Sequence, residues 1–369
     1  MSWLERYGFD QNLFASWQKA VKSGAFSKEN NVVTGELTAP EPGSIKKLPG
    51  AGTKAGKDAA KLGAEAIGRG ELGVVILNGG MATRFGGVVK GTVPVLGKDR
   101  SFLALAFEDV LHAQKEHGGT VHVFLMNSFA TEESTRQHLE SHGWYGLDPK
   151  QVHAFNQFVS VRMTRDGKLF NTADGKISAY GPGHGDFAGA FRASGCLQRF
   201  LTAGGKWLLV RNVDNLGARI NPLLLGQHIK AATDMTIELA PKWPEDVGGS
   251  PFCVDGKLQL VEQIRYPKDF DPNVVQVFNT NTFWFRAAAL DREFDLGRYY
   301  VEKTVEDKKV VQIEHLIGEM SAHLSCTYLQ VRRSGKDNRF LPIKTPEDLS
   351  SAREEIQEIY GLGAEGSAD

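Results

Sequence analysis

The sequence predicts an α/β protein with a doubly wound, mainly parallel, Rossmann-like sheet that continues into a mixed or antiparallel extension. Short apolar runs, typical of strands buried on both faces, alternate with helical patterns from residue 71 to about residue 234. After that point strand-like segments follow one another with fewer helices between them. Ligands of doubly wound sheets bind at the carboxyl ends of the strands, so we expect chemistry in the loops at those ends.

The composition is that of a globular protein large enough for more than one ordinary core. The chain has 369 residues, of which 41% are hydrophobic and 24% charged, and its formal net charge is −1. A net charge this close to zero gives no overall positive potential that would attract nucleic acid or an anionic membrane. Local groups must therefore hold any anionic ligand. No apolar run approaches the length of a bilayer span, and the amino terminus is charged where a signal peptide is apolar. The three cysteines lack CxxC spacing. These features predict a cytoplasmic protein with reduced cysteines that binds neither nucleic acid nor membrane.

The first 70 residues are predicted to form a helical segment and a linker. Large apolar side chains recur at helical spacing within residues 11–22, which predicts an amphipathic helix. Residues 40–58 are rich in Pro, Gly, Lys and Ala. We interpret them as a solvated linker or surface loop rather than a mobile basic flap, because runs of charge usually face water.

The α/β pattern begins with an apolar run at residues 72–77, which predicts a buried strand. A glycine-rich loop follows, and then a helix from about Ser101 whose apolar side chains fall on one face. Residues 121–126 predict the next strand. A helix from about residue 187 to 201 leads into another strand at residues 206–210.

The remaining segments predict the extension of the sheet and a final helix. Residues 258–264, 274–285 and 326–333 have the pattern of antiparallel strands, and we expect them to build one side of the ligand site. The final helix opens at Thr345, an N-cap residue followed by proline at the first helical position and an acidic residue at the third.

The strongest local signal is the loop at residues 78–91, NGGMATRFGGVVKG, directly after the first buried strand. Its glycines allow backbone N–H groups to approach a phosphate chain closely, and Arg84 and Lys90 supply positive charge. The loop matches neither the P-loop pattern nor the dinucleotide pattern GxGxxG. Glycine alone would indicate only a tight loop, but two cations inside it favour a phosphate site.

Three further segments carry candidate residues. Three glycines surround His184 in YGPGHGD (180–186), which fits either a backbone that passes close to a ligand or a flexible turn with an exposed histidine. Asp214 follows the strand at 206–210, a position where Mg²⁺ is normally held opposite a phosphate loop, although a lone aspartate can also cap a helix. Lys344 directly precedes the final helix, where a cation is unfavourable unless an anion lies there too.

Taken together, these segments resemble the UTP–glucose-1-phosphate uridylyltransferase family, also called UDP-glucose pyrophosphorylases. The resemblance runs in family order from about residue 71 to 350. It rests on LNGGMATRFGG with Lys90, MNSF (126–129), FNQ (155–157), GPGHGD (181–186), NVDNLGA (212–218), LVEQ (260–263), FNTNTFWF (278–285), QIE (312–314) and RFLPIKTPEDL (339–349).

The resemblance implies a nucleotidyltransferase domain at residues 71–350, between the segment 1–70 and a helix end and tail at 351–369. It implies transfer of UMP from UTP to glucose 1-phosphate by direct in-line displacement with Mg²⁺, giving UDP-glucose and pyrophosphate. Two alternatives stay open: a UDP-N-acetylhexosamine or broad UDP-sugar pyrophosphorylase, and a catalytically silent UTP-binding homologue. A sugar transferase fits less well, because no Asp-x-Asp motif stands at the end of a predicted strand.

The resemblance also implies roles for individual residues. The catalytic residues that neutralise the triphosphate are Arg84, Lys90 and Lys344, and Asp214 holds Mg²⁺. The nucleotide is bound by Leu77, Gly79, Gly80, Gln157 and Gly183. The hexose and its phosphate are bound by His184, Gly185, Asn215, Gly249, Glu262, Asn279 and Asn281. The amide of Gln157 can both donate to and accept from a uracil edge, which favours UTP over ATP.

The chain departs from the family pattern in several places. Ala82 stands where the family usually has Gly, and the segment before Lys90 is shorter and lacks the usual Gly-Pro, so the match of Lys90 depends on where a gap is placed. Thr282 follows Asn281 where the family often has a second Asn. The chain stops soon after the final helix, without the β-helix domain that the eukaryotic enzymes use for assembly. We therefore expect a monomer or a small homo-oligomer.

Overall fold

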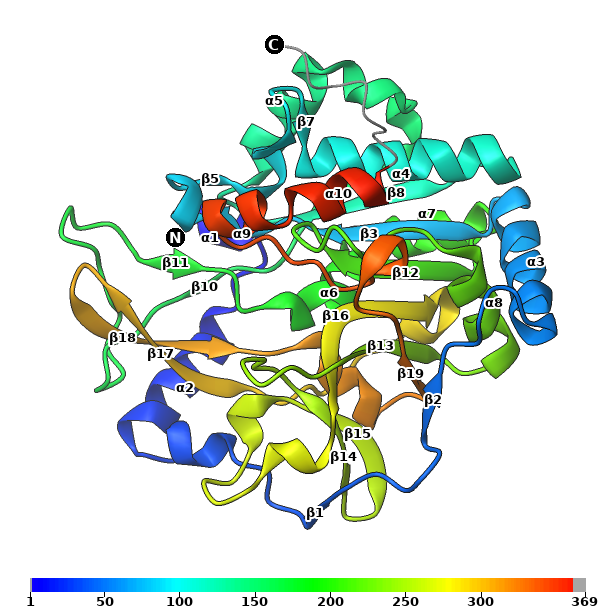
Figure 1. The fold of residues 1–369 in the computed structure, drawn as a ribbon. Helices are drawn as coiled ribbons and strands as arrows, with labels where there is room; N and C mark the ends of the chain where they lie inside the picture. Colours follow the sequence, from blue (N-terminus) through cyan, green and yellow to red (C-terminus); the bar gives the residue numbers. More distant parts are fainter. Residues whose placement is uncertain (1, 361–369) are drawn as a thin grey trace.

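The computed structural model describes residues 2–360, which form an α/β fold around an eight-stranded sheet (Figure 1). In spatial order its strands are β2 (Ile45–Lys47), β19 (Cys326–Gln330), β13 (Met235–Pro241), β16 (Val277–Arg286), β12 (Trp207–Asn212), β3 (Leu72–Leu77), β8 (His122–Asn127) and β9 (Val152–Asn156). Every strand of this sheet except β16 runs in the same direction. The predicted α/β class, with a mainly parallel sheet and a mixed extension, is confirmed.

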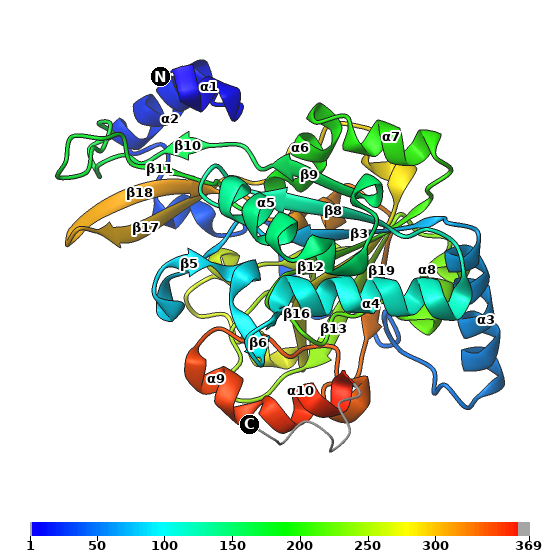
Figure 2. The same cartoon turned by 90° about the horizontal axis from the view of Figure 1, so that it is seen from above.

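Helices cover both faces of the sheet (Figure 2). The α-helices of the described residues are α1 (Ser2–Arg6), α2 (Gln11–Lys22), α3 (Lys54–Gly68), α4 (Phe102–His117), α5 (Glu132–Ser141), α6 (Phe187–Ala193), α7 (Cys196–Thr202), α8 (Pro222–Ala231), α9 (Pro346–Ser351) and α10 (Arg353–Ile359). One core joins α3, α4, α5, α8 and α10 to the face of β3 that carries Val74 and Ile76. A second core joins α6 and α7 to the opposite face, which carries Val75, as alternation along a strand requires. No helix among the described residues is long and apolar enough to cross a membrane.

Smaller strands extend the fold beyond the main sheet. A three-stranded sheet contains β1 (Leu37–Thr38), β14 (Ser250–Val254) and β15 (Lys257–Val261), and β17 (Tyr299–Val305) pairs with β18 (Lys308–Glu314). Short pairs are β4 (Met81–Ala82) with β5 (Val88–Val89), β6 (Pro94–Leu96) with β7 (Arg100–Ser101), and β10 (Ser160–Val161) with β11 (Ala179–Tyr180). Helices α1 and α2 share a third core with β10 and β18, so the amino-terminal helices lie beside these outer strands.

Several predicted helix ends are confirmed by their capping interactions. Ser101 caps α4, and its side chain accepts a hydrogen bond from the Ala104 N–H. Thr345 and Asp348 form a reciprocal capping box at the start of α9, with Pro346 as the first helical residue. The amphipathic helix expected at residues 11–22 is α2. In each case a polar side chain satisfies N–H groups that the helix itself leaves without partners.

Three local predictions were wrong. Residues 40–58 are not only a linker, because they contain edge strand β2 and the start of α3. The sequence did not reveal β2, because a strand of three residues is too short to show a periodic pattern. The helix expected over residues 187–201 is divided into α6 and α7 at Gly195, whose φ of +73° ends a helical turn. Strand β19 runs parallel to both its neighbours, not antiparallel, because apolar patterns do not encode strand direction.

Helices α3 and α8 cross at two glycines that permit close backbone contact. A Cβ atom added to Gly63 would lie 1.9 Å from the Pro222 carbonyl oxygen, and one added to Gly226 would lie 1.8 Å from the Ala59 carbonyl oxygen. Both contacts are with backbone atoms, which cannot move away as a flexible side chain would. The helices must therefore separate if either glycine gains a side chain.

We expect Gly226→Ala to lower the free energy of unfolding by about 2 kcal/mol, because the overpacked helices must shift. Urea unfolding followed by circular dichroism measures this change. Gly52→Ala is the matched control, since an added Cβ at Gly52 would have no neighbour within 4 Å. Equal stability of the two variants would contradict the tight crossing.

Candidate functional site

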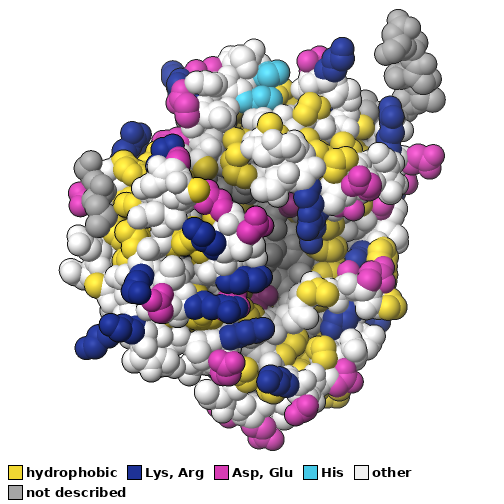
Figure 3. Space-filling model, turned by 90° about the vertical axis from the view of Figure 1, so that its left-hand side faces the viewer, with side chains coloured by type: hydrophobic (Ala, Val, Ile, Leu, Met, Phe, Trp, Pro, Cys, Tyr) yellow, Lys and Arg dark blue, Asp and Glu magenta, His cyan; other side chains and the backbone are white. Residues whose placement is uncertain are grey.

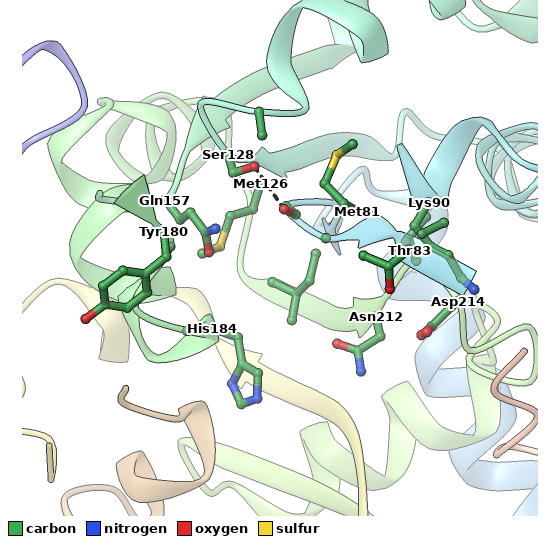
Figure 4. A pocket seen from close by; sticks show the side chains of 18 of the residues that line it. Met81, Thr83, Lys90, Met126, Ser128, Gln157, Tyr180, His184, Asn212 and Asp214 are labelled. Carbon is green, nitrogen blue, oxygen red and sulfur yellow. Dashed lines mark hydrogen bonds between the residues drawn. The ribbon is translucent and has the colours of Figure 1, made fainter. Parts of the chain in front are cut away.

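A cavity of about 720 Å³ lies at the carboxyl ends of the central parallel strands (Figure 4). Its walls come from residues 79–84 after β3, 128–130 after β8, Gln157 after β9 and 212–214 after β12. Parallel strands that lie side by side end at the same edge, so loops far apart in the sequence meet there. The molecule is also hollowed on the side that Figure 3 shows, where Lys and Arg side chains gather beside the hollow.

Most of the predicted nucleotide, phosphate and metal residues meet in this cavity. The predicted residues that line it are Leu77, Gly79, Gly80, Arg84, Lys90, Gln157, Gly183, His184, Asp214 and Lys344. Gly185 lines a second cavity on the other side of its loop. The predicted hexose residues Asn215, Gly249, Glu262, Asn279 and Asn281 do not line the first cavity.

One end of the cavity is built around the amide of Gln157. A Cβ atom added to Gly79 would lie 2.9 Å from Gln157 Nε2, and one added to Gly181 only 1.9 Å from it, so both glycines leave room for this side chain. The Ser128 hydroxyl donates to the Gly79 carbonyl oxygen at 2.9 Å and fixes the loop on the other side. The amide of Gln157 is thus held in a narrow slot beside free backbone, an arrangement that suits the flat, hydrogen-bonding edge of a base.

The other end of the cavity is charged. Lys90 is buried, and its Nζ lies 4.4 Å from the centroid of the Phe85 ring and 5.1 Å from that of Phe102. This burial lowers the pKa of Lys90, while Asp214 and Asp348 act to raise it. No carboxylate among the described residues lies within ion-pair distance of Lys90. Lys90 is therefore a desolvated cation with no described carboxylate in contact. A phosphate that contacts its Nζ would form a strong charge-assisted hydrogen bond.

Asp214 is the candidate metal ligand opposite Lys90. Burial raises the pKa of Asp214, whereas Lys90 and Lys344 act to lower it. Within residues 2–360, no cluster of three or more His, Cys, Asp or Glu side chains has the arrangement of a metal site. A single carboxylate beside a phosphate-binding loop is a donor set that Mg²⁺ commonly uses together with substrate phosphates. The predicted role of Asp214 as a Mg²⁺ ligand stays a prediction.

The two departures in the glycine-rich loop have a structural explanation. Ala82 has a φ of −82° and pairs with Val88, so its backbone needs no glycine. Two glycines later in the loop, Gly86 and Gly87, have φ values of +85° and +80° and make the reversal. The Lys90 N–H then donates to the Gly80 carbonyl oxygen at 3.2 Å, and this closure brings Lys90 to the cavity despite the shortened segment before it.

Lys344 lies at the rim of the cavity, but the argument from its helix end needs correction. The side chain of Asp348 accepts hydrogen bonds from the backbone N–H groups of Lys344 and Thr345, at 2.8 and 2.9 Å. The anion expected at this helix end is therefore supplied in part by the chain itself. The exposed side chain of Lys344 is still available to a phosphate, because it lines the cavity.

His184 is held in one orientation. Its Nδ1 accepts a hydrogen bond from the Ile317 N–H at 3.0 Å, which places the proton of the neutral ring on Nε2. Burial lowers the pKa of His184 to about 4, so the ring is neutral near pH 7 and acts as a donor. The preceding Gly183 has a φ of +110°, and a Cβ there would lie 2.5 Å from the His315 carbonyl oxygen. This is a fixed loop, not a flexible turn with an exposed histidine.

The comparisons with known proteins agree with this arrangement. A model of the UTP–glucose-1-phosphate uridylyltransferase family matches residues 21–360. The chain belongs to this family. Among curated relatives, the UTP–glucose-1-phosphate uridylyltransferase of Hordeum vulgare is 31% identical over 294 residues, which are 76% of this chain and 61% of the relative. The probable enzyme of Schizosaccharomyces pombe is 29% identical over 308 residues, 78% of this chain and 60% of the relative.

The chain thus spans about 60% of the length of the curated relatives it matches. A solved UDP-glucose pyrophosphorylase variant from Leishmania major has a TM-score of 0.68 at 26% identity and covers 91% of this chain and 73% of its own. A putative UDP-N-acetylglucosamine pyrophosphorylase from Entamoeba histolytica has a TM-score of 0.76 at 18% identity and covers 87% of each chain, which shows a shared fold. The resemblance inferred from the motifs is confirmed at the level of family and fold.

The residues predicted to bind the hexose form a cluster next to His184. Strand β16 bulges against β13 at residues 280–282, where Asn281 takes a φ of +55°. Asn279 Nδ2 donates to Asn281 Oδ1 at 2.9 Å, and the Asn279 N–H donates to the Gly249 carbonyl oxygen at 2.8 Å. The bulge therefore brings the two amides into contact, whereas a regular strand would hold residues 279 and 281 apart along one face of the sheet.

Glu262 completes this cluster. A Cβ at Gly249 would lie 2.7 Å from Glu262 Oε2, and one at Gly318 would lie 2.8 Å from Glu262 Oε1. Gly318 directly follows Ile317, the residue that binds the His184 ring, so Glu262 lies behind His184 as seen from the cavity. Burial, and then repulsion from Glu319, raise the pKa of Glu262 to about 7. Near neutral pH this carboxyl group can both donate to and accept from hydroxyl groups.

Asn215 has a structural position. Its Nδ2 donates to the Arg339 carbonyl oxygen at 3.1 Å, and its Oδ1 accepts from the Leu341 N–H at 2.9 Å. These bonds brace the loop that carries Asp214 against the segment that leads to Lys344. The predicted contact of Asn215 with the hexose stays a prediction.

Sequence reasoning did not identify Arg162, which also lines the cavity. Its Nε donates to Gln312 Oε1 at 2.7 Å and its Nη1 to the Ala179 carbonyl oxygen at 2.8 Å. Burial lowers the pKa of Arg162. No motif marks this arginine, because only the pairing of β10 with β11 brings it to the cavity.

We expect Glu262→Gln to change the pH dependence of stability. The folded chain binds the Glu262 proton more tightly than the unfolded chain, so this group stabilises the fold at low pH, and that stabilisation is lost as pH rises from about 4.5 toward 7. The loss is on the order of 2 kcal/mol, and Gln, which does not titrate, removes it. Urea unfolding at pH 5, 6, 7 and 8 measures the difference between the two profiles. The exposed Glu41→Gln variant is the control, and parallel profiles for wild type and Glu262→Gln would refute the raised pKa.

Proposed function

We propose that the protein transfers UMP from UTP to glucose 1-phosphate and releases UDP-glucose and pyrophosphate. The observation that carries the proposal is a single cavity with a base-reading amide at one end and a buried lysine–aspartate arrangement at the other, in a chain of this family. The relatives and solved structures named above support the choice of substrates. The activity is proposed for the chain itself, which spans about 60% of those relatives.

The nucleotide would enter with its base at the Gln157 end. The amide of Gln157 and the backbone of Leu77, Gly79 and Gly80 would bind the uracil edge. The phosphates would then extend along the glycine-rich loop toward Lys90. This direction follows from the positions of the two ends of the cavity, because the neutral donors and acceptors lie at one end and the cations at the other.

In the reaction an oxygen of the glucose 1-phosphate group attacks the α-phosphorus of UTP in line. The bond from that phosphorus to the oxygen that bridges to the β-phosphate breaks, and pyrophosphate leaves with this electron pair. The nucleophile is already an anion, so no general base and no covalent enzyme intermediate are needed. Catalysis comes from aligning two anions that repel each other and from neutralising the charge of the transition state.

The residues of the chain have separate parts in this step. Lys90 and Arg84 would neutralise the α- and β-phosphates, and Lys344 the attacking or departing group. The His184 Nε2–H is placed to donate to the sugar or its phosphate. When bound between Asp214 and phosphate oxygens, Mg²⁺ would supply further charge neutralisation. The amides of Asn279 and Asn281 and the carboxyl group of Glu262 would bind hexose hydroxyls.

The proposal includes a cytoplasmic location and a monomeric or small homo-oligomeric state. All three cysteines lie in the described part of the chain and are free, and this supports a reducing compartment. A sedimentation measurement of the purified chain determines the oligomeric state directly.

We expect Lys90→Met to lower kcat for pyrophosphate release by about 10²–10³-fold, by analogy with the loss of one oxyanion-hole donor. Methionine keeps the length of the side chain and its contact with Phe85 and Phe102, so packing is largely retained. Lys57→Met, on the exposed side of α3, is the matched control. Wild-type turnover in Lys90→Met would remove Lys90 from the mechanism.

We also expect pyrophosphate release from UTP with glucose 1-phosphate and at least tenfold less with galactose 1-phosphate or N-acetylglucosamine 1-phosphate, because the predicted hexose residues Asn279, Asn281 and Glu262 are hydrogen-bonded to one another in fixed positions. A coupled phosphate assay with the three sugars in parallel measures this. Comparable rates would identify a broad UDP-sugar enzyme. Binding of UTP without release with any sugar would identify a silent homologue.

A further inference from the structure

A second cavity, of about 340 Å³, lies on the other side of the loop at residues 180–186. Successive residues of this loop face opposite cavities: Gly183 and His184 line the first, whereas Gly185 and Asp186 line the second. The remaining walls of the second cavity come from residues 8–10, α2, residues 158–160, α6, the segment 293–298 and His315. Its volume falls within the range of small-molecule sites, which is about 300–1,000 Å³.

The segment that follows β18 connects the two cavities mechanically. His315 lines the second cavity, where its Nε2 pairs with Asp186 Oδ1 at 2.5 Å. The same residue binds the loop backbone, because its N–H donates to the Pro182 carbonyl oxygen at 2.9 Å and its carbonyl oxygen accepts from the Gly185 N–H at 3.0 Å. Two residues later, the Ile317 N–H holds the His184 ring at 3.0 Å. A displacement of His315 or Asp186 must therefore move His184.

The walls of the second cavity combine aromatic rings with arginine. The aromatic side chains that line it are Phe9, Trp17, Phe158 and Phe294. All four are half-buried: Phe9 and Trp17 pack against the third core, Phe158 and Phe294 pack against the second, and the remaining surface of each ring lines the cavity. Flat apolar walls of this kind favour an aromatic ligand.

The charges around the second cavity favour an anion. Neither Arg192 nor Arg298 forms an ion pair with a described residue, and Arg192 Nη1 is buried without a hydrogen-bond partner there. Two of the lining carboxylates are already engaged, because Asp10 accepts from the Leu13 N–H at the start of α2 and Asp186 pairs with His315. The third, Glu293, is exposed at the rim. Arg192 and Arg298 are thus the lining cations without an ion pair, and the negative charges of Asp10 and Glu293 lie at the exposed rim.

We propose that the second cavity binds a planar aromatic anion, such as an aromatic carboxylate, and that its occupancy alters UTP binding in the first cavity through the shared loop. The carboxylate accepts hydrogen bonds from Arg192 and Arg298 while the ring lies between the aromatic side chains. The ligand contacts the Asp186–His315 pair, and this contact changes the position of His184 and Gly183. The coupling rests on the proposed function, because it takes UTP as the ligand of the first cavity.

The test uses 2-naphthoate and its uncharged analogue 2-naphthamide, titrated into the full chain by isothermal calorimetry. We expect one naphthoate per chain and at least tenfold weaker binding of the amide, because the amide cannot form charge-assisted bonds with the arginines. Leu13→Trp, which fills the cavity from α2, and Arg298→Gln should each weaken naphthoate at least tenfold. Their matched controls, Asn12→Trp on the exposed side of α2 and Arg353→Gln at an exposed arginine of α10, should leave it unchanged.

The coupling is measured by titrating UTP in the presence and absence of saturating naphthoate. We expect the Kd of UTP to change, and the Kd of naphthoate to change by the same factor when UTP is saturating, because binding linkage is reciprocal. One-for-one displacement of naphthoate by UTP, equal binding of the amide, or no effect of Leu13→Trp would overturn the second site. Unchanged UTP affinity would overturn the coupling. Failure of UTP to bind at all would overturn the proposed function and the coupling together. The naphthoate titrations would still show whether the second cavity binds an aromatic anion.

Discussion

The site depends on a lysine that the fold removes from water before any substrate arrives. Lys90 is placed against two aromatic rings and faces Asp214 without touching it. A buried charge without a close partner is costly, and the chain tolerates it because the glycine-rich loop and strand β12 are both fixed by the parallel pairing of β3 with β12. An anion close to Lys90 would offset that cost. The other lining residues of the cavity surround this point.

The remaining parts of the site use irregular backbone at the edge of a regular sheet. The bulge in β16 gathers the amides of Asn279 and Asn281 in front of Glu262, and the loop before α6 reverses at Gly183 so that His184 can be held by Ile317. Such irregularities are stable because the strands beneath them are fully buried and paired. Asn215 has a complementary part, since its bonds tie the Asp214 loop to the segment that carries Lys344. The Entamoeba histolytica protein, at 18% identity and a TM-score of 0.76, has the same fold.

The loop at residues 180–186 and the segment at residues 157–162 each contribute to both cavities. In the loop, Gly181 lies against the Gln157 amide, whereas Pro182 and Gly185 are hydrogen-bonded to His315. These segments connect the first cavity to the amino-terminal helices, whose sequence carries no catalytic motif. Helix α2 packs beside β10 and β18, and residues of the segment 8–17 line the second cavity.

The sequence by itself determined the α/β class, the chain positions of β3, β8, β12, β16 and β19, and the helix starts at Ser101 and Thr345. It also determined the loops that carry Arg84, Lys90, Gln157, His184 and Asp214. These features are local, since apolar periodicity, capping side chains and glycine-rich turns act over a few neighbouring residues. Only the tertiary structure decided four other features. These are the direction of β19, the break at Gly195, the separation of the hexose cluster from the main cavity, and the presence of Arg162 in that cavity. Each of them depends on which distant segments meet, and packing between segments far apart in the sequence leaves no periodic trace in either one.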